Sequence, residues 1–176
     1  MKIAIVGSGG VGGYFGGKLA SAGFDVTFVA RGEHLRAMQT GGLTVKSILG
    51  DFKVPTVKAT ADLSEIAGCD LVILAVKAWQ VCPIATELKE VISGNTVILP
   101  LQNGVMALDE LREHLAESML LNGLCKIFSK IESPGVISHF GITPTILFGE
   151  PDNSLSTRVL AIKQIFDTAG IYSEIP

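Results

Sequence analysis

The sequence is organised around residues 1–17, which read MKIAIVGSGGVGGYFGG. The stretch begins with a short apolar run, Lys2–Val6, typical of a parallel strand that is buried on both faces. Three glycines follow with the spacing G-x-G-x-x-G, at Gly7, Gly9 and Gly12. In this spacing the first glycine allows a tight turn, the second lets the backbone approach a pyrophosphate, and the third lets helix and strand pack closely. The stretch therefore predicts a dinucleotide-binding strand, turn and helix.

The helix after this loop is expected at about residues 11–22, with an apolar face that includes Tyr14, Phe15 and Leu19. Its free N–H groups and positive dipole end would point at the bound phosphates. The residues expected to hold the phosphates are Gly7, Ser8, Gly9, Gly10, Val11 and Gly12. The alternative is a glycine-rich turn that only packs tightly.

The composition indicates one compact α/β domain. The chain has 176 residues, of which 48% are hydrophobic and 18% charged, and this length is enough for one sizeable core. The net charge is -3, without a basic run, so we expect no nucleic-acid partner.

The cysteines and the lack of long apolar runs indicate a cytoplasmic protein. Cys69, Cys82 and Cys125 are scattered and odd in number, which favours reduced thiols over disulfides or a zinc site. Residue 1 already belongs to the first strand, and no apolar run approaches the roughly 20 residues that span a bilayer. We therefore expect no metal, no signal peptide and no membrane partner.

Strand and helix patterns alternate along the chain. This order predicts a Rossmann-type, doubly wound, mostly parallel sheet with helices on both faces. Strands are expected at residues 25–29, 69–76, 96–101, 119–124 and 171–174, and helices at residues 81–92, 105–114 and 154–169. Shorter elements are expected too: helical turns at 34–38 and 62–65, a strand pair at 41–46 and 52–57 outside the main sheet, and a hairpin of strands 135–139 and 145–148 joined through Gly141 and Pro144.

The end of the second strand favours NADP(H) over NAD(H). In NAD-binding domains of this kind an acidic residue, about 20 positions beyond the glycines, binds the ribose hydroxyls. Here Ala30 and Arg31 occupy that place, and a guanidinium suits a 2′-phosphate. The alternative is a solvated loop arginine, with Glu33 two positions further on.

Two further candidates follow buried strands, where ligands bind in open α/β sheets. Lys77 comes directly after the apolar strand at 69–76 and either contacts the ligand or simply leaves the strand for water. Asn103 follows the strand at 96–101, and its amide suits a nicotinamide edge or a substrate carbonyl. Because Asn-Gly is also a common turn dipeptide, both interpretations of Asn103 stay open.

A proton donor is harder to find. His34, His114 and His139 lie in separate elements without metal-ligand spacing, and we interpret them as surface or packing residues. Cys125 has no placed base, so a nucleophilic role is not favoured.

Beyond single motifs, the chain resembles the ketopantoate reductases (2-dehydropantoate 2-reductases), specifically their N-terminal domain. The resemblance is carried, in family order, by GSGGVG at 7–12, AR at 30–31, GL at 42–43, LAVKAWQ at 74–80, LQNG at 101–104 and GVISH at 135–139.

The resemblance implies an enzyme in which NADPH reduces 2-dehydropantoate to pantoate for pantothenate and coenzyme A biosynthesis. It implies that the glycine loop holds the pyrophosphate, that Arg31 holds the 2′-phosphate, and that Lys77 and Gln80 line the cofactor site. Asn103 would contact both nicotinamide and substrate, as the catalytic residue within this chain.

The resemblance also implies a second, all-helical domain, beginning about where residue 176 lies, that supplies a proton-donor lysine. Residues 1–176 would then form the dinucleotide-binding domain alone, bind NADP(H) and turn over little or no substrate. A stand-alone NADP-binding module and a reductase of another 2-keto acid are the alternatives. Apolar surface on the 154–169 helix and the last strand would favour self-association, such as a homodimer.

Overall fold

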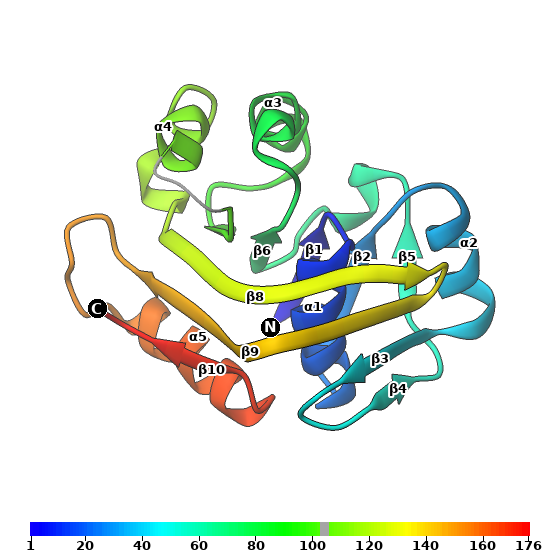
Figure 1. Ribbon diagram of the computed structural model, residues 1–176. Coiled ribbons are helices and arrows are strands. Elements are labelled where there is room, and N and C mark those ends of the chain that lie inside the picture. Colours follow the sequence, from blue (N-terminus) through cyan, green and yellow to red (C-terminus); the bar gives the residue numbers. More distant parts are fainter. Residues whose placement is uncertain (103–105) are drawn as a thin grey trace.

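The computed structural model describes residues 1–102 and 106–176 and contains two five-stranded sheets (Figure 1). The first sheet is parallel throughout, in the order β5-β2-β1-β6-β7. Its strands are β1 (Lys2–Val6), β2 (Asp25–Val29), β5 (Lys58–Thr60), β6 (Leu71–Leu74) and β7 (Val97–Pro100). The carboxyl ends of all five strands therefore meet at one edge.

The central strand β1 is buried on both faces, as its continuous apolar run predicts. Ile3 and Ile5 belong to one core cluster, whereas Ala4 and Val6 belong to the other, and all four are at most 1% exposed. The alternation follows from the two-residue period of a strand. No polar side chain at these positions would find a partner, which explains the composition of the segment.

Helices cover both faces of this sheet, so the predicted doubly wound fold is confirmed. Helix α1 (Gly10–Ser21), α2 (Gly32–Gly41) and α5 (Thr157–Thr168) contribute side chains to the first core cluster, and α3 (Val81–Val91) and α4 (Met106–Arg112) to the second. Three 3-10 helices complete the set: η1 (Leu63–Ile66), η2 (Ala78–Gln80) and η3 (Glu117–Met119). No helix in the described ranges combines the length and apolarity needed to cross a membrane.

The second sheet is an unpredicted layer. It contains β3 (Leu43–Ser47), β4 (Phe52–Val54), β8 (Asn122–Ser133), β9 (Val136–Gly149) and β10 (Tyr172–Glu174). The strand order is β10-β9-β3-β4, and β8 pairs with β9. The strand pair expected outside the main sheet is confirmed as the antiparallel β3 and β4. Helix α1 packs against strands of both sheets.

The hairpin was predicted at the wrong place. The turn between β8 and β9 contains Pro134 and Gly135, not Gly141 and Pro144, which lie inside β9. Lys126 pairs with Thr145 and Phe128 with Phe140, so residues 141–144 form a bulge opposite one residue of β8. The strand expected at 119–124 was found as the start of β8, but three residues later than expected, because Met119 ends η3 and β8 starts at Asn122. The bulge absorbs a glycine and a proline that were interpreted as turn residues.

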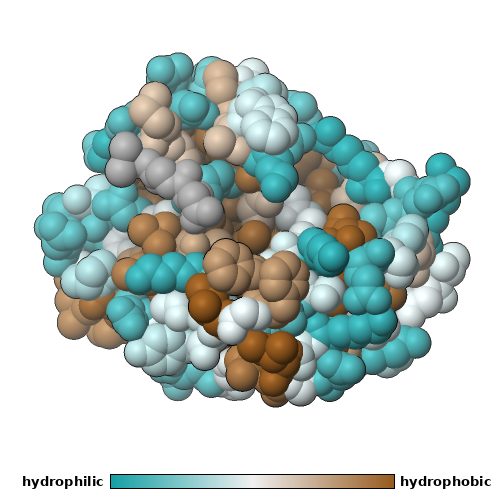
Figure 2. Space-filling model, viewed as in Figure 1, coloured by the Kyte–Doolittle hydropathy of each residue, from teal (hydrophilic) through white to brown (hydrophobic). Residues whose placement is uncertain are grey.

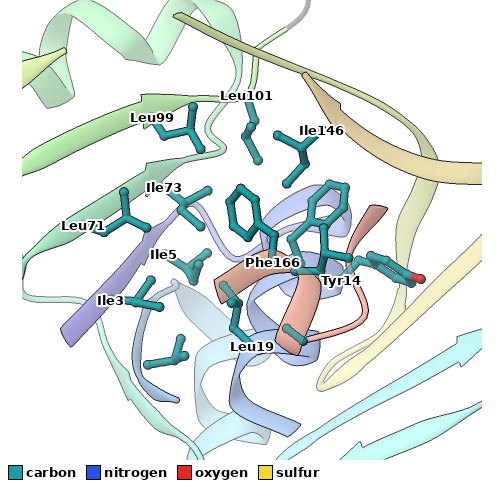
Figure 3. Packing of buried hydrophobic residues seen from close by; sticks show 14 of the residues in the cluster. Ile3, Ile5, Tyr14, Leu19, Leu71, Ile73, Leu99, Leu101, Ile146 and Phe166 are labelled. Atoms are coloured by element: carbon teal, nitrogen blue, oxygen red, sulfur yellow. The ribbon is translucent and has the colours of Figure 1, made fainter. Parts of the chain in front are cut away.

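Helix α5 buries its apolar face inside this chain. Val159, Ile162 and Phe166 are at most 1% exposed, and Phe166 lies opposite Ile73 and Leu99 of the parallel sheet (Figure 3). The expectation that this face stays bare for a partner was therefore wrong, since the second sheet and α1 complete the core around it. Leu155, at the start of the predicted helix, is exposed instead.

Candidate functional site

Close contacts allow only glycine at two positions of the loop after β1. Gly7 has a φ of +94°, and a Cβ there would lie 2.8 Å from the backbone of Ala75. A Cβ on Gly12 would lie 2.1 Å from the carbonyl oxygen of Gly7. Only glycine fits both positions, as the predicted turn and helix packing require.

Gly9 differs from these two glycines because space surrounds it. In the part of the chain that the structure describes, no heavy atom lies within 4 Å of an ideal Cβ at Gly9, which is the N-cap residue of α1. No side chain caps the first turn of α1, and the turn holds no acidic residue. A free helix N-terminus beside an open glycine backbone fits an incoming pyrophosphate.

Ser8 connects the loop to β2. Its hydroxyl donates to the carbonyl of Val29 at 2.9 Å, and its N–H donates to the same carbonyl at 3.1 Å. The side chain is only 3% exposed. Ser8 thus borders the site predicted for it and holds the loop against the end of β2.

Two pockets lie on either side of the loop. The Arg31 pocket, of about 300 Å³, is lined by Gly7, Ser8, Val29, Ala30, Arg31, His34, Gln80 and Ile131, among others. The Gln102 pocket, of about 520 Å³, is lined by Gly10, Val11, Leu101, Gln102, Cys125, Lys126, Phe128 and Ser129, among others. Both include Gly9, Ala75, Val76 and Lys77, so they form one groove around the loop. Figure 2 shows this face hollowed between α3 and β8.

The charged side chains of the groove are all cationic. Arg31 and Lys77 line one pocket and Lys77 and Lys126 the other, and no Asp or Glu is among the described lining residues. Arg31 is exposed at the start of α2, and within residues 1–102 and 106–176 it forms no ion pair. Glu33 does not line the groove. The groove therefore suits a polyanionic ligand.

Lys77 and Gln80 occupy the turn after β6. The backbone N–H of Lys77 donates to Gln80 Oε1 at 3.2 Å, which holds the turn together. Both residues line the Arg31 pocket, and Lys77 also lines the Gln102 pocket. The structure thus brings Lys77 to the loop, although the two are far apart in sequence.

Gln102 is a site residue that the sequence interpretation passed over in favour of Asn103. Its Nε2 donates to the carbonyls of Leu74 at 3.0 Å and Val76 at 3.1 Å, while its buried Oε1 has no partner among the described atoms. The side-chain amide of Gln102 thus connects the ends of β6 and β7 beside the Gln102 pocket. The position of Gln102 directly after a buried strand was the sequence signal that could have identified it. Asn103 itself lies outside the described residues.

Comparison with known proteins assigns the family. The family described as ketopantoate reductase PanE/ApbA matches residues 3–153. The chain belongs to this family. It is 34% identical to a 2-dehydropantoate 2-reductase of Nostoc sp., over 99% of this chain and 56% of the relative.

Solved structures of the family have the same fold. A 2-dehydropantoate 2-reductase of Geobacter metallireducens superposes with a TM-score of 0.90 at 32% identity, covering 99% of this chain and 57% of that one. The enzyme of the same name from Porphyromonas gingivalis gives 0.93 at 29% identity, covering 100% and 64%. The chain thus spans little more than half the length of the relatives it matches.

In this member of the family Cys125 is a buried thiol. Burial raises its pKa to about 11, and its Sγ donates to the carbonyl of Leu101 at 3.3 Å. A protonated thiol is a weak nucleophile, which agrees with the sequence interpretation.

The three histidines differ in their surroundings. His139 is 2% exposed and packs with Tyr14, while its ring nitrogens contact Ser47 Oγ and the carbonyl of Ile142, both at 2.8 Å. His114 contacts Cys82 at 3.3 Å, away from the groove. His34, which was interpreted as a surface or packing residue, lines the Arg31 pocket. Sequence alone missed it, because only the fold brings this position to the glycine loop.

Proposed function

We propose that this chain is the NADP(H)-binding half of a 2-dehydropantoate 2-reductase. The enzyme would reduce 2-dehydropantoate to pantoate with NADPH in pantothenate and coenzyme A biosynthesis. Family membership supports the reaction, and the supporting observation in this chain is the cationic groove around an open glycine loop, with Arg31 at the end of β2. An acid at that position would favour NAD(H), whereas a guanidinium favours a 2′-phosphate.

The described residues divide the binding task between the two pockets. Backbone N–H groups at Gly9 to Gly12 would bind the pyrophosphate, and Arg31 would pair with the 2′-phosphate. Lys77 lies between the two pockets, where its charge acts on both halves of a dinucleotide. Asn103 would orient the nicotinamide and the ketone, which contributes to catalysis through positioning.

The cofactor, when bound, supplies a hydride to the keto carbon, and the resulting alkoxide oxygen needs a proton. We propose that this proton comes from a lysine in the part of the family's chain without a counterpart among these 176 residues. The chain alone should then bind the nucleotide and turn over little or no substrate, because general acid catalysis typically contributes about 100-fold to 10000-fold. We also propose a cytoplasmic location, supported by three free cysteines.

Calorimetric titration with NADPH and NADH tests the proposal. We expect tighter binding of NADPH, and we expect Arg31→Ala to lower NADPH affinity about 10-fold to 100-fold while NADH binding changes little, because a charge-assisted hydrogen bond to phosphate is lost. Arg36→Ala is the matched control, since Arg36 is exposed on the same helix and does not line the groove.

Two outcomes separate the parts of this proposal. Binding of neither nucleotide by the unaltered chain would contradict the cofactor role. Rapid NADPH oxidation by the chain with 2-dehydropantoate would support the reaction but contradict the assignment of the proton donor to another segment.

A further inference from the structure

His139 is held at both ring nitrogens by partners inside the chain. It lies on β9, pairs in register with Ser47 of β3 and is only 2% exposed. Its Nδ1 is 2.8 Å from Ser47 Oγ, and its Nε2 is 2.8 Å from the carbonyl oxygen of Ile142. The ring of Tyr14, on the helix that follows the glycine loop, packs against it with centroids 4.9 Å apart. These contacts fix the orientation of the imidazole.

The hydrogen-bond partners also determine the tautomer of this ring. A carbonyl oxygen only accepts, so Nε2 carries the proton that it donates to Ile142. In the neutral ring Nδ1 is then an acceptor, and the hydroxyl of Ser47 donates to it. The Ser47 oxygen in turn accepts from the backbone N–H of Leu49 at 3.1 Å, which leaves its own proton for the ring.

The carbonyl that accepts from His139 belongs to the bulge of β9. Residues 141–144 face a single residue of β8, so the ladder between the two strands is interrupted there. Gly141 has a φ of +85°, which lets the backbone leave the regular strand. Because strand pairing alone does not determine the course of the bulge, the hydrogen bond from His139 to Ile142 is the contact that holds it.

The bulge forms part of the wall of the Gln102 pocket. Ile142 lines this pocket, and its side chain is 42% exposed. Phe128 lines it as well, and its ring lies against Gly141, where an added Cβ would approach a ring carbon to 2.6 Å. The His139 hydrogen bond therefore positions two apolar side chains of the pocket from behind. Bulges are common next to active sites, where they re-aim side chains in this way.

The Gln102 pocket lies across the glycine loop from Arg31. Under the proposed function the Arg31 pocket takes the 2′-phosphate end of the cofactor, because Arg31 follows β2. A dinucleotide crosses the switch point of such a sheet, so its nicotinamide end would enter the Gln102 pocket, beyond β6 and β7. An apolar wall in that place suits the face of a nicotinamide ring.

We propose that His139 is a positioning residue for the nicotinamide half of the cofactor. Through Nε2 it holds the bulge, and the bulge holds Ile142 and Phe128 at the place of the nicotinamide ring. His139 itself is not among the residues that line either pocket. This inference rests on the proposed NADP(H) role of the groove, and it gives a functional role to a histidine that was interpreted as a packing residue.

Two amide substitutions separate the two ring nitrogens. In His139→Gln the side-chain amide nitrogen lies near the place of Nε2, so it can still donate to Ile142. In His139→Asn the amide lies near the place of Nδ1, so the contact with Ser47 can form but the donor to Ile142 is lost. Each variant therefore keeps one of the two hydrogen bonds, and only His139→Asn releases the bulge.

Two ligands separate the two halves of the groove. NADPH would occupy both pockets, whereas adenosine 2′,5′-bisphosphate has no nicotinamide and would occupy the Arg31 pocket alone. Calorimetric titration of the 176-residue chain should show NADPH affinity about fivefold lower in His139→Asn and within about twofold in His139→Gln, because one hydrogen bond is at stake. The affinity for adenosine 2′,5′-bisphosphate should stay within about twofold in both variants.

Two further measurements do not depend on how the histidine variants fold. Ile142→Ala removes a half-exposed side chain from the pocket wall, so the chain should fold normally, bind NADPH more weakly and bind adenosine 2′,5′-bisphosphate as before. In the unaltered chain, long-range 1H–15N spectra should show the proton of the His139 ring on Nε2. A cationic ring, a proton on Nδ1 or unchanged NADPH affinity in Ile142→Ala would overturn the inference.

The binding outcomes distinguish this inference from the proposed function. Unchanged NADPH affinity in His139→Asn, or an equal loss for both ligands, overturns the positioning role of His139 while the proposed function stands. Equal affinities of the unaltered chain for the two ligands also overturn it, because the Gln102 pocket would then contribute nothing to binding. If the unaltered chain binds neither ligand, the proposed function and this inference fail together.

Discussion

The segment from β1 to β2 and the hairpin of β8 and β9 flank the same groove, yet they depend on the sequence in different ways. The expected helix at residues 11–22 was found as α1, Gly10–Ser21, and the expected strands on either side of it were found as β1 and β2. The hairpin was expected as short strands with a turn near Gly141, but it consists of strands of 12 and 14 residues with the turn at Gly135.

The difference has a physical cause. In the first segment, the loop is determined by contacts such as that between Gly12 and the carbonyl of Gly7, only five residues away. The hairpin instead depends on partners that are remote in sequence: β9 pairs with β3 and β10 as well as β8. A glycine and a proline are compatible with a strand there because β8 and β9 tolerate a bulge between Lys126 and Phe128.

The largest expected effect is in the locally determined segment. Gly12→Ala places a Cβ 2.1 Å from a backbone oxygen that cannot move aside, so we expect a loss of at least about 3 kcal/mol in the free energy of unfolding. Urea denaturation measures it. An unaltered denaturation midpoint would show that the loop is not held by this contact.

Gly9→Ala is the matched control for Gly12→Ala, and it tests nucleotide binding instead of stability. Space surrounds Gly9 and its φ is -75°, so we expect an unfolding free energy within about 0.5 kcal/mol of that of the unaltered chain. The added methyl group would occupy the place of the pyrophosphate, so NADPH affinity should fall at least about tenfold. Unchanged NADPH affinity would show that the glycine loop does not bind the nucleotide.

A smaller effect is expected at the end of the hairpin, which is held by tertiary contacts. Arg158 on α5 donates from Nε to Glu150 Oε1 at 2.6 Å and from Nη2 to Glu150 Oε2 at 2.5 Å, and it also donates to the carbonyls of Ser118 and Leu120 ahead of β8. Glu150 is 7% exposed. Glu150→Gln should therefore lower the free energy of unfolding by about 2 kcal/mol, as measured in urea.

Glu132→Gln is the control for this change, because its partner Lys46 is about half exposed and the pair is on the surface. We expect a loss below about 1 kcal/mol there. Equal losses in the two variants would contradict the special role of the buried pair.

The same carboxylate predicts a pH dependence. Hydrogen bonds from Arg158 lower the pKa of Glu150 in the folded chain, so the unfolded chain takes up this proton first as the pH falls. The stabilisation is complete above the unfolded-state pKa of about 4.3 and decreases below it. The difference between the unaltered chain and Glu150→Gln should therefore shrink in urea titrations below about pH 4.

The smallest expected effect is on the exposed face of the hairpin. Phe128 and Phe140 are a cross-strand pair with ring centroids 6.2 Å apart, and both rings are about half exposed. A double-mutant cycle to alanine should give a coupling of about 0.5 kcal/mol in urea denaturation. A coupling near zero would indicate that backbone pairing alone maintains the register of the bulged hairpin.

Much of the candidate site could be predicted from single segments. Arg31 and Lys77 were predicted from their positions after apolar runs, because the carboxyl ends of parallel strands meet at one edge. Gln102 and His34 were missed. The Nε2 of Gln102 is held by two carbonyls at and just after the end of β6, and His34 accepts a hydrogen bond from a hairpin residue 101 positions away; neither partner can be identified from the local sequence.

The sequence by itself determined the parallel sheet, the glycine loop and the helix after it, because buried strands need continuous apolar runs and the contact between Gly12 and Gly7 joins residues close in sequence. Tertiary structure decided where β8 turns into β9, that α5 buries its apolar face within the chain, and that His34 and Gln102 line the groove. The physical reason is that strand pairing and hydrogen-bond satisfaction depend on partners distant in sequence, which the periodicity of a single segment does not identify.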